Sequence, residues 1–192
     1  VERRNWVALL VQHEMAGREI IYMDETSVSV WDHNVRTWMY RAEPLPHVLP
    51  KERAPNITVL GAISTKRPGL EYVFSHSTNQ AAVAQLMKKV LRRAEDSQEV
   101  VVVWDNHSSH WSRGVAELIA EAGATLLPLP VNSSDLNQIE RVWALLKSRW
   151  QRALYQLDGD LKADDARALL DKVLREEVVP KTANYANGGR DI

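Results

Sequence analysis

The chain has 192 residues, which is enough for one globular domain with a substantial hydrophobic core. It contains no cysteine, which excludes disulfide frameworks and thiolate metal sites, and no apolar run close to the roughly 20 residues that span a bilayer. The formal net charge of −1 argues against a protein that binds nucleic acid through bulk positive charge. Any contact with nucleic acid would have to come from local groups of Lys and Arg.

The first part of the chain predicts one helix and several strands. Residues 1–18 carry apolar side chains at helical spacing, and residues 20–23 predict a buried strand that ends at the acidic pair Asp24-Glu25. Residues 26–56 predict one or two strands followed by a proline-rich loop. Two further strands are expected at residues 57–64 and 70–75, because both runs are rich in β-branched or aromatic residues.

The second part predicts helices that alternate with strands. A capping-box pattern at residues 77–80 precedes an apolar helical stripe, and residues 99–104 predict a strand buried on both faces that ends at Asp105. Ser112 is expected to cap a helix that Gly123 stops, before a strand at residues 124–129. Asp135 is expected to cap a long helix, and a last amphipathic helix follows residue 160. This order predicts an α/β fold with helices packed on a central sheet.

Three carboxylates stand out in this arrangement. Asp24 and Asp105 each follow an apolar strand, and Glu140 lies at the margin of the apolar stripe of the long helix. Three converging carboxylates would repel one another, but two divalent cations reverse that cost and support in-line displacement at phosphorus. An Asp after a strand is also a common turn or cap residue, and a lone Glu on a helix is usually solvated. The spacing alone therefore leaves the assignment open.

The local sequences around these residues resemble the three catalytic blocks of the mariner-like DDE transposases, most closely the glutamate-ending and bacterial insertion-sequence branches. The matching stretches are MDET at residues 23–26, DNHSSH at residues 105–110, and LLPLP with SSDLNQIERVW at residues 126–130 and 133–143. The gap of 34 residues between Asp105 and Glu140 is typical of the glutamate branch. The similarity runs from about residue 20 to residue 155.

The resemblance implies a ribonuclease H-like fold, with a central mixed five-stranded sheet flanked by helices. It places a catalytic domain at residues 20–180, between a connector helix at 1–19 and a flexible tail at 181–192. It also implies two Mg²⁺ or Mn²⁺ ions per active site, held by Asp24, Asp105 and Glu140, for cleavage at transposon ends and strand transfer into target DNA. Asn106 and His110 match positions close to the site and are expected to position substrate, although His110 fits a capping or packing role equally well.

The expected partners are double-stranded DNA, as transposon ends and target, and a second copy of the chain in a homodimer. Helix-turn-helix modules are expected upstream, and the expected location is with DNA inside the cell: the bacterial cytoplasm or nucleoid, or a eukaryotic nucleus. The candidate DNA-backbone contacts are grouped basic residues, which also suit ordinary solvated helix faces. They are Lys88, Lys89, Arg92, Arg93, Lys147, Arg149 and Arg152.

The chain departs from the family pattern in the segment before Glu140. Val131, Asn132, Ser134 and Gln138 stand where the family usually has Pro, Tyr, Pro and Pro. The loss of three prolines is expected to loosen the loop that orients Glu140. Two alternatives therefore remain open: a domesticated DNA-binding or assembly protein with weak or no catalysis, and a ribonuclease H-like nuclease without strand transfer.

Overall fold

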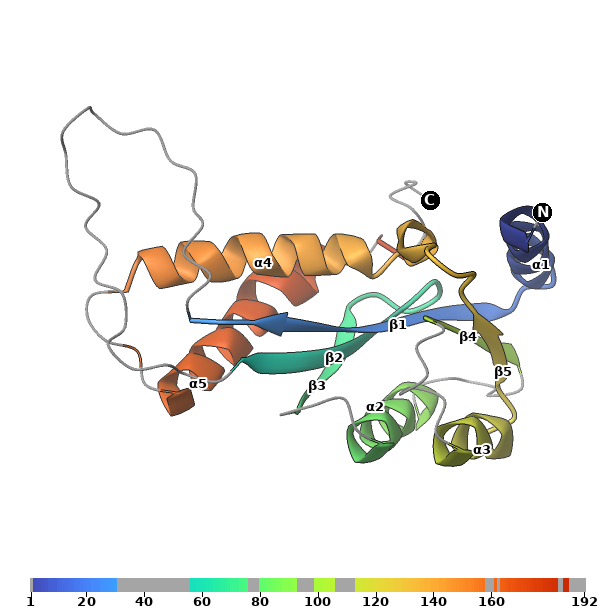
Figure 1. The fold of residues 1–192 in the computed structure, drawn as a ribbon, viewed down its shortest axis with the longest axis horizontal. Coiled ribbons are helices and arrows are strands. Elements are labelled where there is room, and N and C mark those ends of the chain that lie inside the picture. The colour runs from blue at the N-terminus through green and yellow to red at the C-terminus, as the bar shows by residue number, and fades with distance from the viewer. Residues whose placement is uncertain are drawn as a thin grey trace.

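A computed structural model of the chain describes residues 2–30, 56–75, 80–92, 99–105, 113–157, 161, 163–182 and 185–186. Its centre is a five-stranded sheet in the order β3-β2-β1-β4-β5 (Figure 1). The strands are β1 (Glu19–Val28), β2 (Ile57–Ser64), β3 (Leu70–Ser75), β4 (Val100–Trp104) and β5 (Thr125–Pro128). The pairs β1–β2 and β2–β3 are antiparallel, and the pairs β1–β4 and β4–β5 are parallel. The predicted mixed sheet of five strands is confirmed.

Helices cover both faces of this sheet (Figure 1). One face carries α4 (Glu140–Tyr155) and α5 (Ala163–Val173), and the other carries α2 (Gln80–Arg92) and α3 (Arg113–Glu121). Side chains alternate between the two layers along β1 and β4, as the pleat of a strand requires. Tyr22 and Val103 belong to the α4 layer, whereas Ile21 and Val102 belong to the α2 layer. All five residues of β4 are buried, as the sequence predicted.

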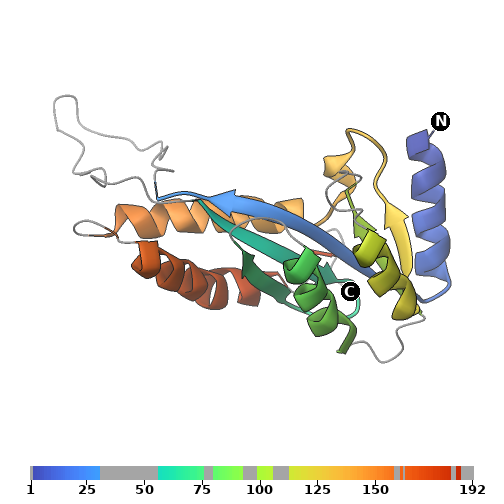
Figure 2. The same ribbon diagram turned by 60° about the horizontal axis from the view of Figure 1, so that its bottom comes forward.

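The first helix, α1 (Glu2–Met15), lies at the end of the molecule beside β5 (Figures 1 and 2). Its Trp6 is buried in the same hydrophobic core as the α4 layer, and Arg18, just after the helix, contacts the Thr125 hydroxyl of β5 at 3.4 Å. Leu9, expected on the apolar face, is instead exposed. The predicted N-terminal helix is therefore packed onto the domain through Trp6.

The first strand differs from the prediction at its end. β1 does not stop at Asp24-Glu25 but continues to Val28, so Asp24 lies in the middle of a ten-residue strand. The reason is its two neighbours: β1 pairs with β4 only as far as Tyr22, but it pairs with β2 from Ile21 to Val28. Among the described strands, the second half of β1 pairs only with β2. The predicted loop and strands at residues 31–55 lie outside the described residues.

The long helix also begins later than predicted. Asp135 lies in a short 3-10 turn, η2 (Ser134–Leu136), and is not the cap of α4. Asn137 has an extended backbone (φ −86°, ψ 107°), which interrupts helical geometry between this turn and α4. Glu140 is consequently the first residue of α4. The predicted apolar face of the helix is confirmed by the buried residues Val142, Trp143, Leu146, Trp150 and Leu154.

The other helices follow the sequence closely. Four residues of the predicted α2 stripe are buried (Val83, Leu86, Met87 and Val90), and α3 ends before Gly123, whose φ of 74° suits glycine. The expected caps at residues 77–79 and Ser112 lie outside the described residues. α5 continues into a π-helical segment, η3 (Leu174–Val178), and a 3-10 turn, η4 (Val179–Lys181). Thr182 and Ala186, further along the chain, are buried.

Two side chains tie α2 to the antiparallel side of the sheet. Arg67, after β2, binds the buried carboxylate of Glu19 through Nε and Nη2, each at 2.6 Å, and donates through Nη1 to the Val90 carbonyl at 2.9 Å. Lys89 donates to the Tyr72 carbonyl of the edge strand β3 at 3.1 Å. In the described part of the chain, no helix is both long and apolar enough to cross a membrane.

Candidate active site

The parallel pairing of β1 and β4 brings two of the three candidate carboxylates together. The register aligns Tyr22 with Val103, and these are the last residues that the two strands pair. Asp24 and Asp105 each lie two residues further along. Because side chains alternate along a strand, both aspartates share the face of Tyr22 and Val103, which is the face covered by α4.

The third carboxylate comes from α4, on the same side of the sheet. A cavity of about 360 Å³ lies at this point and has all three predicted carboxylates in its wall. It is lined by Asp24, Asp105, Leu129, Pro130, Val131, Asn132, Ser133, Ser134, Asn137 and Glu140. Residues from two strands, one loop and one helix therefore meet at a single cavity.

The loop that leads to Glu140 is held by polar contacts of Ser133, Asp135 and Asn137. Asn132 adopts a left-handed backbone (φ 54°), which asparagine tolerates better than most residues. The Ser133 hydroxyl donates to the Val131 carbonyl at 3.3 Å, and Arg3 of α1 forms a two-pronged ion pair with Asp135. Asn137 donates through Nδ2 to the Met23 carbonyl at 3.0 Å. This last bond joins the loop to β1 directly beside Asp24.

Asp24 is the most strongly perturbed group of the cavity. The pKa of Asp24 is raised to about 7, chiefly by burial and in addition by the negative charges of Glu140 and Glu25. Hydrogen bonds from the Glu25 backbone and from the Trp143 indole act in the opposite direction. The indole N–H of Trp143 donates to Asp24 Oδ2 at 3.1 Å. Desolvation of the charged carboxylate is therefore only partly offset by hydrogen bonding.

Two residues near the carboxylates were missed by the sequence analysis. Asn137 was read only as part of a motif, and Trp143 only as part of the apolar stripe of α4. A signal for Trp143 was present, since a buried indole N–H needs an acceptor and Trp143 lies one turn after Glu140. For Asn137 no comparable signal existed, because its partner is a backbone carbonyl.

The donor set of the cavity suits divalent cations. None of the described residues that line it is Lys or Arg. The Oδ1 atom of Asn137 is buried, and no described residue supplies it with a hydrogen-bond partner. Among the described residues, no three His, Asp or Glu side chains are yet grouped closely enough to hold one ion together. Mg²⁺, however, needs only one or two carboxylates per ion, with water as the remaining ligands.

The basic candidates that the structure describes do not line the cavity. Asn106, His110 and Arg93 lie outside the described residues. Lys88, Lys89 and Arg92 are exposed on α2, on the face of the sheet opposite to α4. On α4, Lys147 and Arg152 are exposed, whereas Arg149 is half-buried and lies 3.7 Å from Glu177. The predicted basic residues thus form two separate groups.

Comparison with known proteins places this arrangement in a family. Residues 19–162 match the family model of the DDE superfamily endonucleases. The chain belongs to this family. No protein of curated function gives a significant sequence match to this DDE endonuclease.

Solved structures show the same fold. The catalytic domain of Mos1 mariner transposase superposes with a TM-score of 0.60 at 18% sequence identity, over 97% of this chain and 84% of that chain. The Mos1 paired end complex with Mn gives a TM-score of 0.64 at 19% identity, over 97% of this chain but 56% of that chain. The Mos1 strand transfer complex gives 0.62 at 17% identity, over 91% and 53%. The chain spans little more than half of the transposase in these complexes, and the predicted ribonuclease H-like fold is confirmed.

Proposed function

We propose that this DDE endonuclease is the catalytic domain of a DNA transposase, which cleaves phosphodiester bonds at transposon ends and joins those ends to target DNA. The observation that carries the proposal is the meeting of Asp24, Asp105 and Glu140 at one cavity in a chain of this family. The structures of Mos1 support it, because they include the paired end and strand transfer complexes of a transposase with this fold.

Asp24, Asp105 and Glu140 would hold two Mg²⁺ or Mn²⁺ ions, since Mos1 structures are described with Mg and with Mn. The ions would supply a polarised nucleophile, water or a 3′-hydroxyl, and stabilise the leaving oxygen. The role of the three carboxylates would be to hold the ions in place, because carboxylates alone would repel a phosphate. Trp143 and Asn137 keep β1 and the start of α4 in register around them. Asn106 and His110 remain candidates for positioning the substrate.

The partners in this proposal are double-stranded DNA, as both transposon ends and target, and a second copy of the chain. The cavity lies on the α4 face, so we assign the first phosphate contacts to α4. Lys147 is exposed and follows Glu140 by seven residues, which places it on the same side of the helix, about two turns away. Arg152 is exposed further along α4, whereas Arg149 contacts Glu177.

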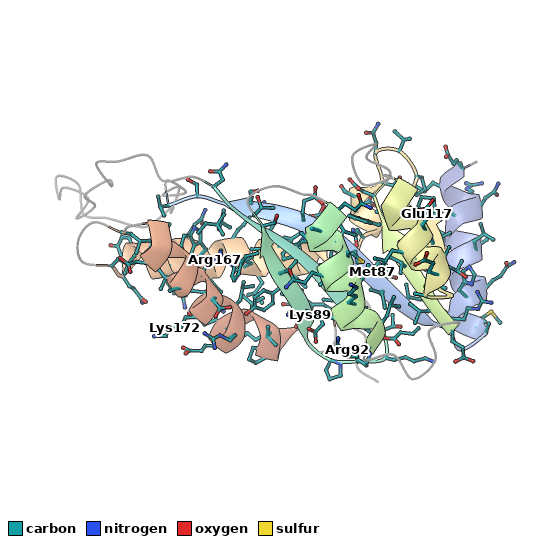
Figure 3. All side chains as sticks on the ribbon, turned by 90° about the horizontal axis from the view of Figure 1, so that it is seen from below. Met87, Lys89, Arg92, Glu117, Arg167 and Lys172 are labelled. Atoms are coloured by element: carbon teal, nitrogen blue, oxygen red, sulfur yellow. The ribbon has the colours of Figure 1, made fainter. Side chains whose placement is uncertain are left out.

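The α2 group faces another direction. Figure 3 shows Lys89 and Arg92 of α2 on one side of the molecule, together with Arg167 and Lys172 of α5. Lys89 already contacts β3, through the Tyr72 carbonyl and the face of the Tyr72 ring. Lys88 and Arg92 are therefore the better candidates of this group for a second DNA segment, with Arg93 beside them in sequence.

The direct test is cleavage of a supercoiled plasmid or of transposon-end duplexes with Mn²⁺ or Mg²⁺. Asp24→Asn, Asp105→Asn and Glu140→Gln should each lower the rate by roughly 1000-fold, because each removes several kcal/mol of stabilisation of the transition state. Asp135→Asn, an exposed acid of the same loop, is the matched control and should keep most of the activity. Cleavage without metal, or full activity in the triad variants, contradicts the proposal.

The same preparation separates the two alternatives. Incubation of pre-cleaved ends with a target plasmid gives joined products for a transposase and none for a nuclease that only hydrolyses DNA. Calorimetric titration with Mn²⁺ tests the non-catalytic scaffold, which should bind no metal in the millimolar range. Failure to join DNA despite metal-dependent cleavage would favour the nuclease.

A further inference from the structure

The indole of Trp143 is placed to hold one oxygen of the Asp24 carboxylate. Trp143 is 2% exposed, so its N–H has no access to bulk water, and it donates to Asp24 Oδ2 at 3.1 Å. Helical side chains lean toward the N-terminus of their helix, over the preceding turn. Trp143 therefore reaches back under the first turn of α4, where Glu140 begins the helix.

Gly61 provides the space for this ring. It lies directly across from Asp24 in the antiparallel pairing of β1 with β2. A Cβ atom at this position would come within 2.5 Å of Cη2 of Trp143 and within 3.2 Å of its Cζ2. A contact of 2.5 Å is shorter than real Cβ atoms make, so any residue larger than glycine would force the indole to move. The glycine is needed here for close approach, since its φ is not in the left-handed region.

A second tryptophan of α4 donates its indole N–H to a backbone carbonyl instead of a carboxylate. Trp150 lies seven residues after Trp143, is fully buried, and donates through Nε1 to the Ser29 carbonyl just after β1 at 2.9 Å. Both tryptophans therefore fasten α4 to the chain of β1. Of these two tryptophans, only Trp143 donates to a side chain that lines the cavity, that of Asp24.

We infer that Trp143 is a positioning residue for the metal-binding carboxylate Asp24. The absence of a side chain at Gly61 leaves the space that the Trp143 ring occupies. The Oδ2 atom of the carboxylate is held by the indole N–H, and the Asp24 side chain lines the cavity at that point. Because Trp143 and Glu140 share the first turns of α4, the same contact sets the spacing between Asp24 and Glu140. The inference rests on the proposed function for its link to metal, but the contact itself does not.

The contact can be tested by NMR of the full 192-residue chain without metal. The chain has seven tryptophans, so Trp143→Phe should delete one of seven indole N–H resonances and identify it. Asp24→Ala should move that resonance upfield, because the carboxylate acceptor is gone, and leave the Trp150 resonance, identified by Trp150→Phe, in place. An unmoved Trp143 resonance overturns the inference, whatever the chain does with metal or DNA.

The effect of the Trp143 contact on metal binding can be tested by titration with Mn²⁺. Binding is measured by calorimetry and by the paramagnetic signal of bound Mn²⁺. Trp143→Phe keeps an aromatic ring but loses the N–H, and should weaken Mn²⁺ binding roughly 10–100-fold, as expected for loss of a partner that orients a metal ligand. Trp150→Phe loses the same N–H from the same helix and should change Mn²⁺ binding by less than about twofold. Equal weakening in both variants would mean a general loss of packing and would overturn the inference. Absence of Mn²⁺ binding by the unmodified chain would instead contradict the proposed function.

Gly61 is tested by a double-mutant cycle. Gly61→Ala should weaken Mn²⁺ binding in the unmodified chain, because the added methyl displaces the indole. It should have little further effect in Trp143→Phe, whose smaller ring lacks the Cη2 atom that the methyl would meet. If Gly61→Ala lowered the Mn²⁺ affinity equally in both backgrounds, Gly61 would not act through Trp143.

Discussion

Asp24 and Glu140 both line the candidate active site, and the negative charge of Glu140 disfavours ionisation of Asp24. Together with burial, which is the larger cause, this charge raises the pKa of Asp24 to about 7. A carboxyl group with this pKa is protonated for much of the range in which an exposed aspartate is ionised. Its ordinary value is 3.8, so the folded chain binds a proton here more tightly than the unfolded chain does. The stability of the metal-free protein must therefore depend on pH.

The first prediction concerns this dependence. The contribution of Asp24 to stability is complete below about pH 4 and is lost as pH rises through about 7, because the folded protein must then carry a desolvated charge. In EDTA, Asp24→Asn should be more stable than the unmodified chain at pH 8, by up to a few kcal/mol, and the advantage should shrink toward pH 5. Urea unfolding from pH 5 to pH 8 measures it. A constant difference at all pH values would contradict the assignment.

The second prediction compares the two ties of the loop before Glu140. Asn137→Ala should cost about 1–3 kcal/mol, because it leaves the buried Met23 carbonyl without its donor. Arg3→Ala breaks an ion pair whose side chains are both more than half exposed, and should cost under about 1 kcal/mol. Chemical unfolding of both variants gives the comparison. Equal costs would mean that α1 holds the loop as strongly as Asn137 does.

The third prediction concerns the buried pair of Glu19 and Arg67. Arg67→Ala should destabilise the fold by about 3–5 kcal/mol, because it leaves the Glu19 carboxylate buried and unpaired. Arg67→Lys should recover only part of this loss, since one ammonium group cannot replace the guanidinium that binds both Glu19 and the Val90 carbonyl. The urea concentrations at the unfolding midpoints of the two variants measure this difference. Full recovery of stability in Arg67→Lys would show that a positive charge alone is sufficient to stabilise Glu19.

The fourth prediction distinguishes the two basic groups. If DNA enters from the α4 face, the double variant Lys147→Ala/Arg152→Ala should weaken DNA binding and flatten its salt dependence by about 0.9 in log–log slope for each lost phosphate contact. The matched double variant Lys88→Ala/Arg92→Ala, on the opposite face of the sheet, should change the slope less. Fluorescence anisotropy at several salt concentrations measures both. A larger change for the α2 variant would reverse the proposed direction of entry.

The sequence predicted the elements of this fold well, because each strand and helix carries its own hydrophobic period. Residues 57–64, 70–75 and the buried valines of β4 are found as strands where the pattern placed them. The extension of β1 beyond Asp24 was missed, since it depends on pairing with β2, whose residues lie 29 to 35 positions further along the chain. The break at Asn137 was missed because Asp135 and Leu136 alone suit the start of a helix.

The candidate site was predictable in part for a similar reason. The three carboxylates were found from short motifs, but their common face was not, because a run of valines gives no sign of which side faces α4. That face follows from the parallel register of Tyr22 with Val103. The role of Gly61 depends on how β2 packs against α4 and could not be read from local patterns, whereas the sequence indicated for Trp143 only that its buried N–H needs an acceptor.

The two indoles that fasten α4 to the chain of β1 have a consequence for how this protein can evolve. They join the helix to the strand through Asp24 and Ser29, independently of the segment that links β5 to the helix. Substitutions in that segment other than at Asn137 therefore leave both attachments of the helix in place. A change at either indole would instead remove one of them.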